Sequence, residues 1–358
     1  MGLPTLNFSF STVASTAIAR SQKGTVAMIL KDTKDTGKVF TLTKASQVST
    51  LLTNLGTDNQ DYVKRAFIGY INPPKKVIVY VLDSAETSLA DALNYFAGQK
   101  IDYIVGTPTC TVAEATEITT WVKAERLIGF IPKAVLPNTA ANDESIINFT
   151  ADDIVVGIKT FTSAEYCSRI AGILAGTPFT MSSTYAVLPE IISVAKLSKD
   201  ELDDAIDAGE FVLFFDGEKV KVGRGVNSLT TTTDSKGEAF KKIKIIEIMD
   251  LINNDIRKTA SDVYIGKYNA DYDNKCLLIS AIKDYLTSLE NSGILENGKS
   301  TVGIDTDAVE AYLKSKNINT DDMSEDELKV IKTDDKVFLK STISILDAIE
   351  DITLKFII

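Results

Sequence analysis

The last ten residues of the chain alternate between apolar and polar side chains, as a β-strand with one buried face does. Four apolar side chains fall on one face, namely Ile352, Leu354, Phe356 and Ile358. Thr353 and Lys355 fall on the other. We expect this strand to pair elsewhere in the fold or on another chain, because an apolar face and unpaired backbone groups need a partner.

The start of the chain shows the same alternation. Leu6, Phe8 and Phe10 alternate with polar residues. Residues 12–23, which follow, are small and polar and predict an extended arm. Both ends of the chain therefore predict strands that need a sheet to join.

Between the two ends, helical and strand patterns alternate. Residues 76–82, KVIVYVL, are a continuous apolar run that is typical of a strand covered on both faces. Further strands are predicted over 25–30, 38–43, 103–106, 127–131 and 154–158. Helices are predicted over 44–55, 59–71, 89–97, 112–125, 164–174 and 198–208. This order predicts a parallel sheet with helices on its faces.

After residue 208 the pattern changes. Asp216-Gly217 between two apolar runs predicts a hairpin over 211–222, and the threonine-rich residues 226–233 predict another strand. Helices are then predicted over 243–263, 274–289, 308–314 and 324–331, and strands over 337–345 and 349–358. We expect the strands within 211–222 and 226–233 to receive a terminal strand.

These patterns give a fold class of α/β plus α+β. We predict an extended N-terminal arm over 1–24, a small β/α region over 25–74, a central α/β domain over 75–208 and a C-terminal α+β domain over 209–358. The length of 358 residues is enough for several domains.

Composition narrows the classes of function. The formal net charge of -11 leaves no basic field that would hold nucleic acid or anionic lipid. The three cysteines are far apart and odd in number, which favours free thiols in a reducing compartment. No run approaches the ~18 apolar residues of a membrane-spanning helix, and the start of the chain lacks the pattern of a secretion signal. We expect no contact with nucleic acid and none with a membrane.

The absence of histidine excludes the catalytic sites that depend on an imidazole. Without it, Ser-His-Asp and Cys-His nucleophiles, the common zinc sites and the usual near-neutral base cannot form. An enzyme would depend on carboxylates, lysine or a bound nucleotide. We expect no catalytic residue, no metal site and no cofactor.

One catalytic motif matches formally. Residues 293–300, GILENGKS, fit the pattern of a phosphate-binding loop, with Lys299 and Ser300 in the functional positions. Such a loop requires a buried strand before it and a helix after it. Here an amphipathic helix is predicted before the motif and no helix opens after it, which favours a helix-ending turn. A P-loop nucleotide hydrolase stays open as an alternative function.

Two polar clusters each have a structural and a functional interpretation. Residues 269–274, NADYDN, resemble the start of a calcium loop but lack its glycine and its distal glutamate, so we expect a turn that caps the next helix. Lys241, Lys242 and Lys244 precede the long helix in an otherwise acidic chain. They form either a solvated helix entrance or a basic patch that faces an acidic partner.

Several segments, taken in order, resemble the tail sheath proteins of contractile phages and phage-tail-like particles. They are residues 2–4 (GLP), 20–24 (RSQKG), the α/β block, 225–231 (GVNSLTT), 240–257, and 347–352 (DAIEDI). No single segment is diagnostic, but their order is, and the resemblance covers nearly the whole chain.

The resemblance implies a structural protein that is not an enzyme. Its central domain would have a subtilisin-like fold without catalysis, in keeping with the absence of histidine. Subunits would stack as six-fold rings of a helical sheath around an inner tail tube protein, between baseplate and tail terminator proteins. The strands at both ends of each subunit would add to a sheet in neighbouring subunits, and Leu6, Phe8 and Phe10 would carry that contact in the arm.

The resemblance also implies motion. On contraction the subunits would rotate and move outward, with the donated strands as hinges, and drive the tube through a target cell envelope. The particle, a phage tail or an R-type bacteriocin, would assemble in the bacterial cytoplasm and leave on lysis. Lys241, Lys242 and Lys244 would face the tube. The second alternative is a monomeric α/β binding protein whose termini pair with each other in one sheet.

Overall fold

The computed structural model describes Ile18, Arg20 and residues 22–357. Leu6, Phe8, Phe10 and Ile358 lie outside the described residues, so their predicted role in subunit contacts stays a prediction. The described residues divide into two compact units, one of residues 22–250 with 347–357 and the other of Ile18 and Arg20 with residues 251–346. We call them the sheet unit and the helical unit.

The sheet unit is built on a seven-stranded sheet, counted over the described residues, with the order β2-β3-β1-β4-β5-β6-β9. Its strands are β1 Thr25–Asp32, β2 Val39–Leu42, β3 Lys76–Asp83, β4 Tyr103–Val105, β5 Lys133–Pro137, β6 Ile146–Phe149 and β9 Glu210–Phe211. β2 pairs antiparallel with β3 at one edge, and the other neighbours pair parallel. The predicted parallel sheet is confirmed.

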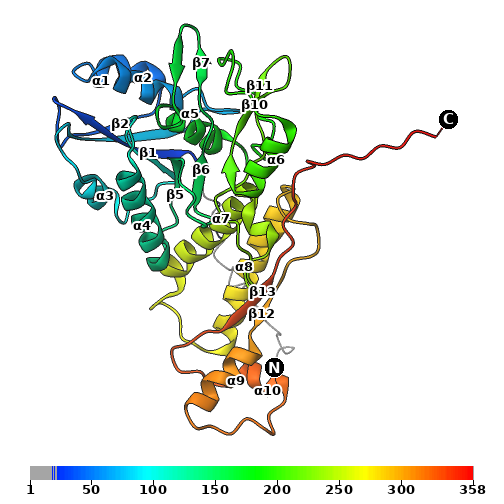
Figure 1. Ribbon diagram of the computed structural model, residues 1–358. Coiled ribbons are helices and arrows are strands. Elements are labelled where there is room, and N and C mark those ends of the chain that lie inside the picture. Colours follow the sequence, from blue (N-terminus) through cyan, green and yellow to red (C-terminus); the bar gives the residue numbers. More distant parts are fainter. Residues whose placement is uncertain (1–17, 19, 21, 358) are drawn as a thin grey trace, which may run out of the picture. The chain divides into compact units, whose positions relative to one another are not determined.

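Helices cover both faces of this sheet (Figure 1). Val26, Met28 and Leu30 of β1 face a core shared with α2 Thr57–Ala66 and α5 Ser163–Gly176. Ala27 and Ile29 face a second core. Its helices are α3 Ala90–Phe96 and α4 Val112–Ile128. Because successive residues of β1 enter opposite cores, both faces of the strand need apolar side chains, which explains its continuous apolar run.

The sheet unit also contains short elements. They are the 3-10 helices Ala45–Gln47 and Glu238–Lys241, α1 Val48–Leu51, α6 Lys199–Asp207, and the strands β7 Ile154–Val156, β8 Lys159–Phe161, β10 Leu213–Phe215 and β11 Val220–Val222. β10 and β11 form the hairpin that Asp216-Gly217 predicts. Gly217 turns it with a φ of 105°, which a residue with a Cβ rarely adopts.

Two predicted strands are wrong. Residues 127–131 are instead the end of α4, which a Thr111/Glu114 capping box starts and Gly129, with a φ of 92°, ends. Leu127 contributes to the apolar run that predicts a strand, but its side chain is 89% exposed at the end of the helix. The neighbouring strand, β5, begins at Lys133. Residues 226–233 form no ladder beyond isolated bridges, because the Asn142 side chain accepts the amides of Thr230 and Thr231 that a strand would use.

The helical unit contains α8 Tyr272–Asn291, α9 Thr306–Ser315 and α10 Glu325–Val330, with a hairpin of β12 Thr301–Ile304 and β13 Leu339–Thr342. The boundary between the units falls inside α7 Ile243–Thr259, which a π-turn at Ala260–Tyr264 ends. A small core joins α9 and α10 through Val309, Leu313 and Leu328. The predicted helix cap is also confirmed, because Asp271 accepts the amide of Asn274 at 2.8 Å.

Candidate assembly surfaces

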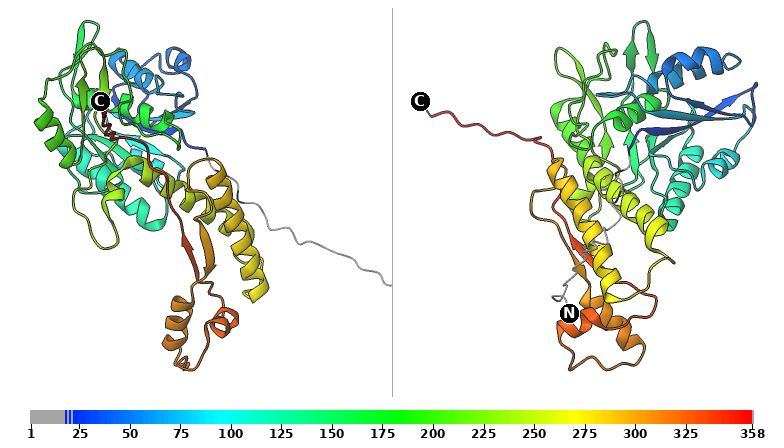
Figure 2. Two further views of the ribbon diagram at one scale, coloured as in Figure 1. Left: turned by 90° about the vertical axis from the view of Figure 1, so that its right-hand side faces the viewer. Right: turned by 180° about the vertical axis from the view of Figure 1, so that it is seen from behind.

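The last described segment of the chain exposes a series of large apolar side chains. Residues 352–357 are extended and lie in no sheet of the structure. Ile352 is 81% exposed and Phe356 80%, and Leu354 and Ile357 are exposed as well. Figures 1 and 2 show the segment running out from the sheet unit with no helix or strand beside it. Monomers rarely expose so many apolar side chains along one extended segment, and such surfaces are typical of segments that contact another chain.

The residues just before this segment are bound tightly to their own unit. Glu350 accepts hydrogen bonds from the hydroxyls of Ser182 at 3.0 Å and Thr184 at 2.6 Å. Asp347 forms an ion pair with Lys242. Asp351 accepts from the Arg224 guanidinium at 2.6 Å. We call these seven residues the C-terminal anchor: Ser182, Thr184, Arg224, Lys242, Asp347, Glu350 and Asp351.

The predicted arm is bound at its own root. Lys23 Nζ lies 2.6 Å from the Glu247 carboxylate on α7, and both side chains are buried. The Tyr103 hydroxyl donates to the same carboxylate. Burial lowers the pKa of Lys23, and Glu247 opposes that shift. A buried, paired lysine therefore fixes the point where residues 22–24 join the sheet unit.

The three lysines predicted to face a tube do not form a free basic patch. Lys241 lies 2.9 Å from Glu238, and Lys242 is paired with Asp347. The Lys244 side chain is buried, and desolvation lowers its pKa although Asp347 and Glu350 favour the charged form. Contact of these lysines with a tube protein stays a prediction.

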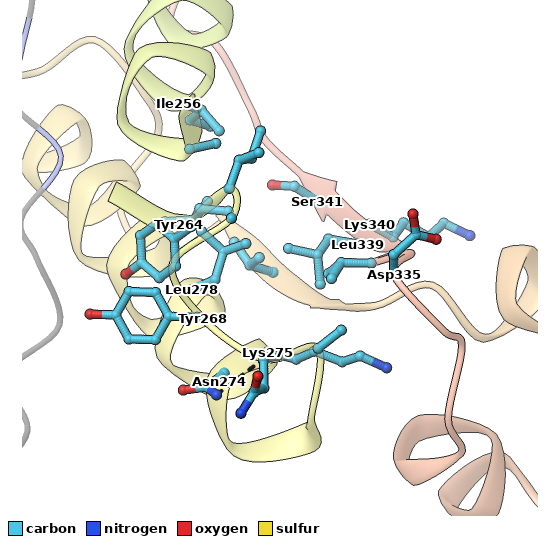
Figure 3. Close-up of a pocket in the computed structure, with 18 residues that line it drawn as sticks. Ile256, Tyr264, Tyr268, Asn274, Lys275, Leu278, Asp335, Leu339, Lys340 and Ser341 are labelled. Atoms are coloured by element: carbon cyan, nitrogen blue, oxygen red, sulfur yellow. Dashed lines mark hydrogen bonds between the residues drawn. The ribbon is translucent and has the colours of Figure 1, made fainter. Parts of the chain in front are cut away.

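The hairpin of the helical unit has two open edges. β12 pairs only with β13 among the described residues, so each strand has one side without a neighbour. Beside it lies a cavity of about 800 Å³, lined by Ile256, Tyr264, Leu278, Ile282, Val302 and Leu339 among others. Figure 3 shows the two tyrosines, Tyr264 and Tyr268, on one side of it and Leu339 on the other. An open edge beside apolar surface is the arrangement that accepts an additional strand.

The loop that resembles a phosphate-binding motif is occupied by its own chain. Its amides at Gly298 and Ser300 donate to the Glu290 carboxylate at 3.0 and 2.9 Å. It follows a helix, α8, and precedes a strand, β12, which is the reverse of the order that a phosphate loop needs. Ile294 and Leu295 are fully buried. The predicted helix-ending turn is confirmed, and the arrangement contradicts a nucleotide site here.

This carboxylate makes the loop sensitive to acid. The Ser300 side chain and the amides of Ser300 and Gly298 lower the pKa of Glu290 to about 2, from about 4.3 in an unfolded chain. The stabilisation is therefore complete above about pH 4.3 and is lost as the pH falls toward 2. We expect amide exchange of residues 298–300, corrected for the intrinsic rate, to increase over that range. Glu290→Gln should exchange without this pH dependence, and an unchanged profile in the variant would contradict the assignment.

Neither a metal-binding cluster nor a membrane-spanning helix occurs among the residues that the structure describes. No group of three or more Cys, Asp or Glu residues could hold a metal ion among these residues. No helix within the described residues is long and apolar enough to cross a membrane. Burial raises the pKa of Cys110 to about 12, so this thiol is a poor nucleophile.

The sequence points to the terminal segment, whose pairing as a strand stays a prediction, and it does not reveal the anchor. Glu350 meets Ser182 and Thr184, which lie 168 and 166 positions away in the sequence. The one local signal was the density of acids in residues 347–351, DAIED.

Comparisons with known proteins agree with this picture of an assembly protein. The family model of the phage tail sheath protein central domain matches residues 40–228, and that of the phage tail sheath C-terminal domain matches residues 235–358. A tail sheath protein of Clostridium phage phiCD119 is 37% identical over 360 aligned positions, which cover 99% of both chains.

Solved structures share the fold. The sheath tail protein of Desulfitobacterium hafniense matches with a TM-score of 0.70 at 20% identity, over 84% of this chain and 93% of its own. The helical sheath of the anti-feeding prophage in its contracted state matches with a TM-score of 0.73 at 13% identity, over 100% of this chain and 99% of its own. The chain belongs to the phage tail sheath protein family, and it is a structural protein and not an enzyme.

Proposed function

We propose that the chain is the subunit of a contractile sheath, which polymerises as stacked six-membered rings around an inner tail tube and contracts to drive that tube through a cell envelope. The observation that carries the proposal is the exposed apolar segment 352–357, which is unpaired in the described chain. Its apolar side chains and unpaired backbone groups are unfavourable in water, and a neighbouring copy of the chain offers a sheet that they can join.

The receiving surface is the β12–β13 hairpin of a neighbouring subunit. It offers two open edges, and the family resemblance predicts two donated strands, one from each end of a subunit. The apolar cavity beside the hairpin supplies a surface against which Leu354 and Phe356 of the donor can pack. This choice replaces the sequence-based expectation of receiving strands within 211–222 and 226–233. Val220 and Val222 of β11 already exchange backbone hydrogen bonds with residues 185–188, and residues 226–233 are not a strand.

Contraction needs no chemical reaction in this proposal. Each subunit that buries a few hundred Å² more apolar surface in the contracted lattice gains several kcal/mol, at about 25 cal/mol per Å². The extended state is then metastable and is held by the tube, the baseplate and the tail terminator. The tail or tail-like particle assembles in the bacterial cytoplasm and is released on lysis.

Further details of the family resemblance are part of the same proposal. The sequence-based division into the arm 1–24, the β/α region 25–74, the central domain 75–208 and the C-terminal domain 209–358 remains a proposal. The seven-stranded sheet itself takes strands from 25–74 and from 210–211 as well as from the central part. The central domain is subtilisin-like in fold, and with no histidine in the sequence it has no Ser-His-Asp triad. Lys241, Lys242 and Lys244 remain the proposed tube-facing residues.

A disulfide crosslink between subunits tests the strand donation. We expect Leu354→Cys combined with either Val302→Cys on β12 or Ser341→Cys on β13 to give a ladder of oligomers on mild oxidation of assembled sheaths. The strand that crosslinks identifies the receiving edge. Each single variant is the control and should give no ladder.

Two outcomes oppose the proposal. If neither double variant gives a ladder in particles that micrographs show to be intact, the hairpin is not the receiver. If the purified chain stays monomeric in the presence of the tube protein and the crosslink forms within one chain, the alternative of a monomeric α/β binding protein is correct.

A further inference from the structure

The terminal segment changes abruptly from bound to free within three residues. The Glu350 side chain is 7% exposed, whereas that of Asp351 is 83% exposed and Ile352 is 81% exposed. The last contact of the anchor is the ion pair of Asp351 with Arg224, and the described residues after it, 352–357, are available to a partner.

The Glu350 carboxylate is the centre of this anchor. Its Oε1 accepts hydrogen bonds from the hydroxyls of Ser182 and Thr184. The Thr184 hydroxyl in turn accepts a hydrogen bond from the backbone amide of Gly225 at 2.9 Å. Its Oε2 has no hydrogen-bond partner among the described residues but lies 3.7 Å from Arg224 Nε and 3.8 Å from Lys242 Nζ. Burying a carboxylate costs free energy unless cations and hydrogen-bond donors surround it. Here two hydroxyl donors and two cations surround the Glu350 carboxylate.

The flanking acids reinforce the same position. Asp347 pairs with Lys242, and Asp351 with Arg224, so each cation serves Glu350 and one neighbour of Glu350. The hydrogen bond from Lys242 lowers the pKa of Asp347, against the opposing effect of burial. The charges of residues 347–351 are thus matched to fixed groups on the sheet unit.

We propose that Glu350 is the positioning residue of the terminal strand: its buried carboxylate holds residues 347–350 on the sheet unit and sets the peptide at which the donated segment begins to swing. The role in assembly rests on the proposed function, while the anchoring itself does not. A strand that joins two subunits transmits force only if its root is fixed, and the anchor supplies that fixed root. The hinge of the donated strand is then at residues 351–352.

Proteolysis of the unassembled chain tests the anchor directly. A glutamyl endopeptidase cuts after Glu350 only when this side chain leaves its site, so release of residues 351–358 reports opening of the anchor. We expect Thr184→Val, which has nearly the same shape without the hydroxyl, to release this peptide roughly tenfold faster than the unaltered chain, because a hydrogen bond to a charged group is lost. Thr184→Ser restores the hydroxyl and should release it at the original rate.

A second variant on another element keeps the test decisive. Arg224→Met should also accelerate the release, and high salt should accelerate it in the unaltered chain, because the Arg224 side chain is only partly buried. Lys221→Met, whose partner is Asp216 in the β10–β11 hairpin, is the matched control and should have no effect. Equal release rates in Thr184→Val, Arg224→Met and the unaltered chain, at equal melting temperature, would overturn the proposal.

The assembled sheath separates this inference from the proposed function. In Thr184→Val, the crosslink from Leu354→Cys to its receiving strand should form several-fold more slowly, although the chain is folded. If the anchor opens as expected in the variants but no crosslink forms in any background, strand donation is wrong and the anchor stands. If the crosslink forms at the original rate while the anchor is open, Glu350 does not position the strand.

Discussion

A chain that ends at Asp351 is expected to fold as the complete chain does and to lose polymerisation. Within the described residues, segment 352–357 makes no hydrogen bond or ion pair and belongs to neither core of the sheet unit. Its removal therefore leaves the melting temperature unchanged. In the proposed sheath the same segment extends from one subunit into the sheet of the next, so its loss removes that contact altogether.

The magnitude of each donated contact explains why the effect is large. Burying four apolar side chains stabilises by roughly 6–12 kcal/mol, while ordering seven backbone residues costs roughly 7–14 kcal/mol. These two terms nearly cancel, so the hydrogen bonds of the strand, at about 0.5–1.5 kcal/mol each, decide whether the free energy of strand addition is favourable. For a shorter or more polar strand, the free energy of strand addition becomes unfavourable.

Two substituted chains make the test specific for the apolar face. Ile352→Ser, Leu354→Ser and Phe356→Ser together should abolish tubes, whereas Thr353→Ser with Lys355→Ser should assemble normally. Negative-stain microscopy after co-expression with the tube protein is the measurement, and thermal unfolding is the control for folding. Tubes of normal length from the truncated chain would show that the last strand does not join subunits.

The sequence could predict those features that depend on local alternation. Successive side chains point into two different cores along residues 26–30 and 76–82. The continuous apolar composition of these strands already indicates parallel strands that are covered on both faces. The alternation of residues 352–356 indicates strand character in the same way. Apolar Leu127 and Ile128 wrongly predict a strand, because they form the last turn of α4, which Gly129 ends.

β13 lies within the predicted strand 337–345, but its pairing with β12 and the anchor could not be predicted in this way. β12 is TVGI, too short to be distinguished from a loop, and it pairs with β13 almost forty residues later. Glu350 looks like one acid among several until the fold places two hydroxyls and two cations around it. Such features depend on long-range contacts, which a single sequence does not display.

The second large effect is expected at Gly172, where α5 crosses α2. A Cβ at this position would lie 2.1 Å from the backbone oxygen of Ala66, far inside van der Waals contact. That oxygen belongs to the last turn of α2 and accepts the amide of Gly69 at 3.2 Å. The Arg169 guanidinium, buried on α5, also donates to the Gly69 oxygen at 2.6 Å. The two helices are therefore joined at a point where neither backbone can yield easily.

Gly172→Ala sets two effects against each other. Alanine favours a helix over glycine by about 1 kcal/mol, which would stabilise α5. The new methyl group forces α2 away from α5 and opens the larger core, and overpacking of this kind costs about 1–3 kcal/mol or more. Because the clash is with backbone and not with a flexible side chain, we expect the cost to exceed the gain and Gly172→Val to be worse.

Chemical denaturation of the two variants measures the balance. Gly237→Ala is the matched control, because a Cβ there meets nothing within 4 Å and its φ is not positive. It should leave the free energy of unfolding within a few tenths of a kcal/mol of the original. Stability of Gly172→Ala equal to that control would mean that α2 and α5 are not in close contact. Loss of stability together with loss of tubes would instead show that the sheath can form only on an intact sheet unit, since the anchor of the donated strand is built on it.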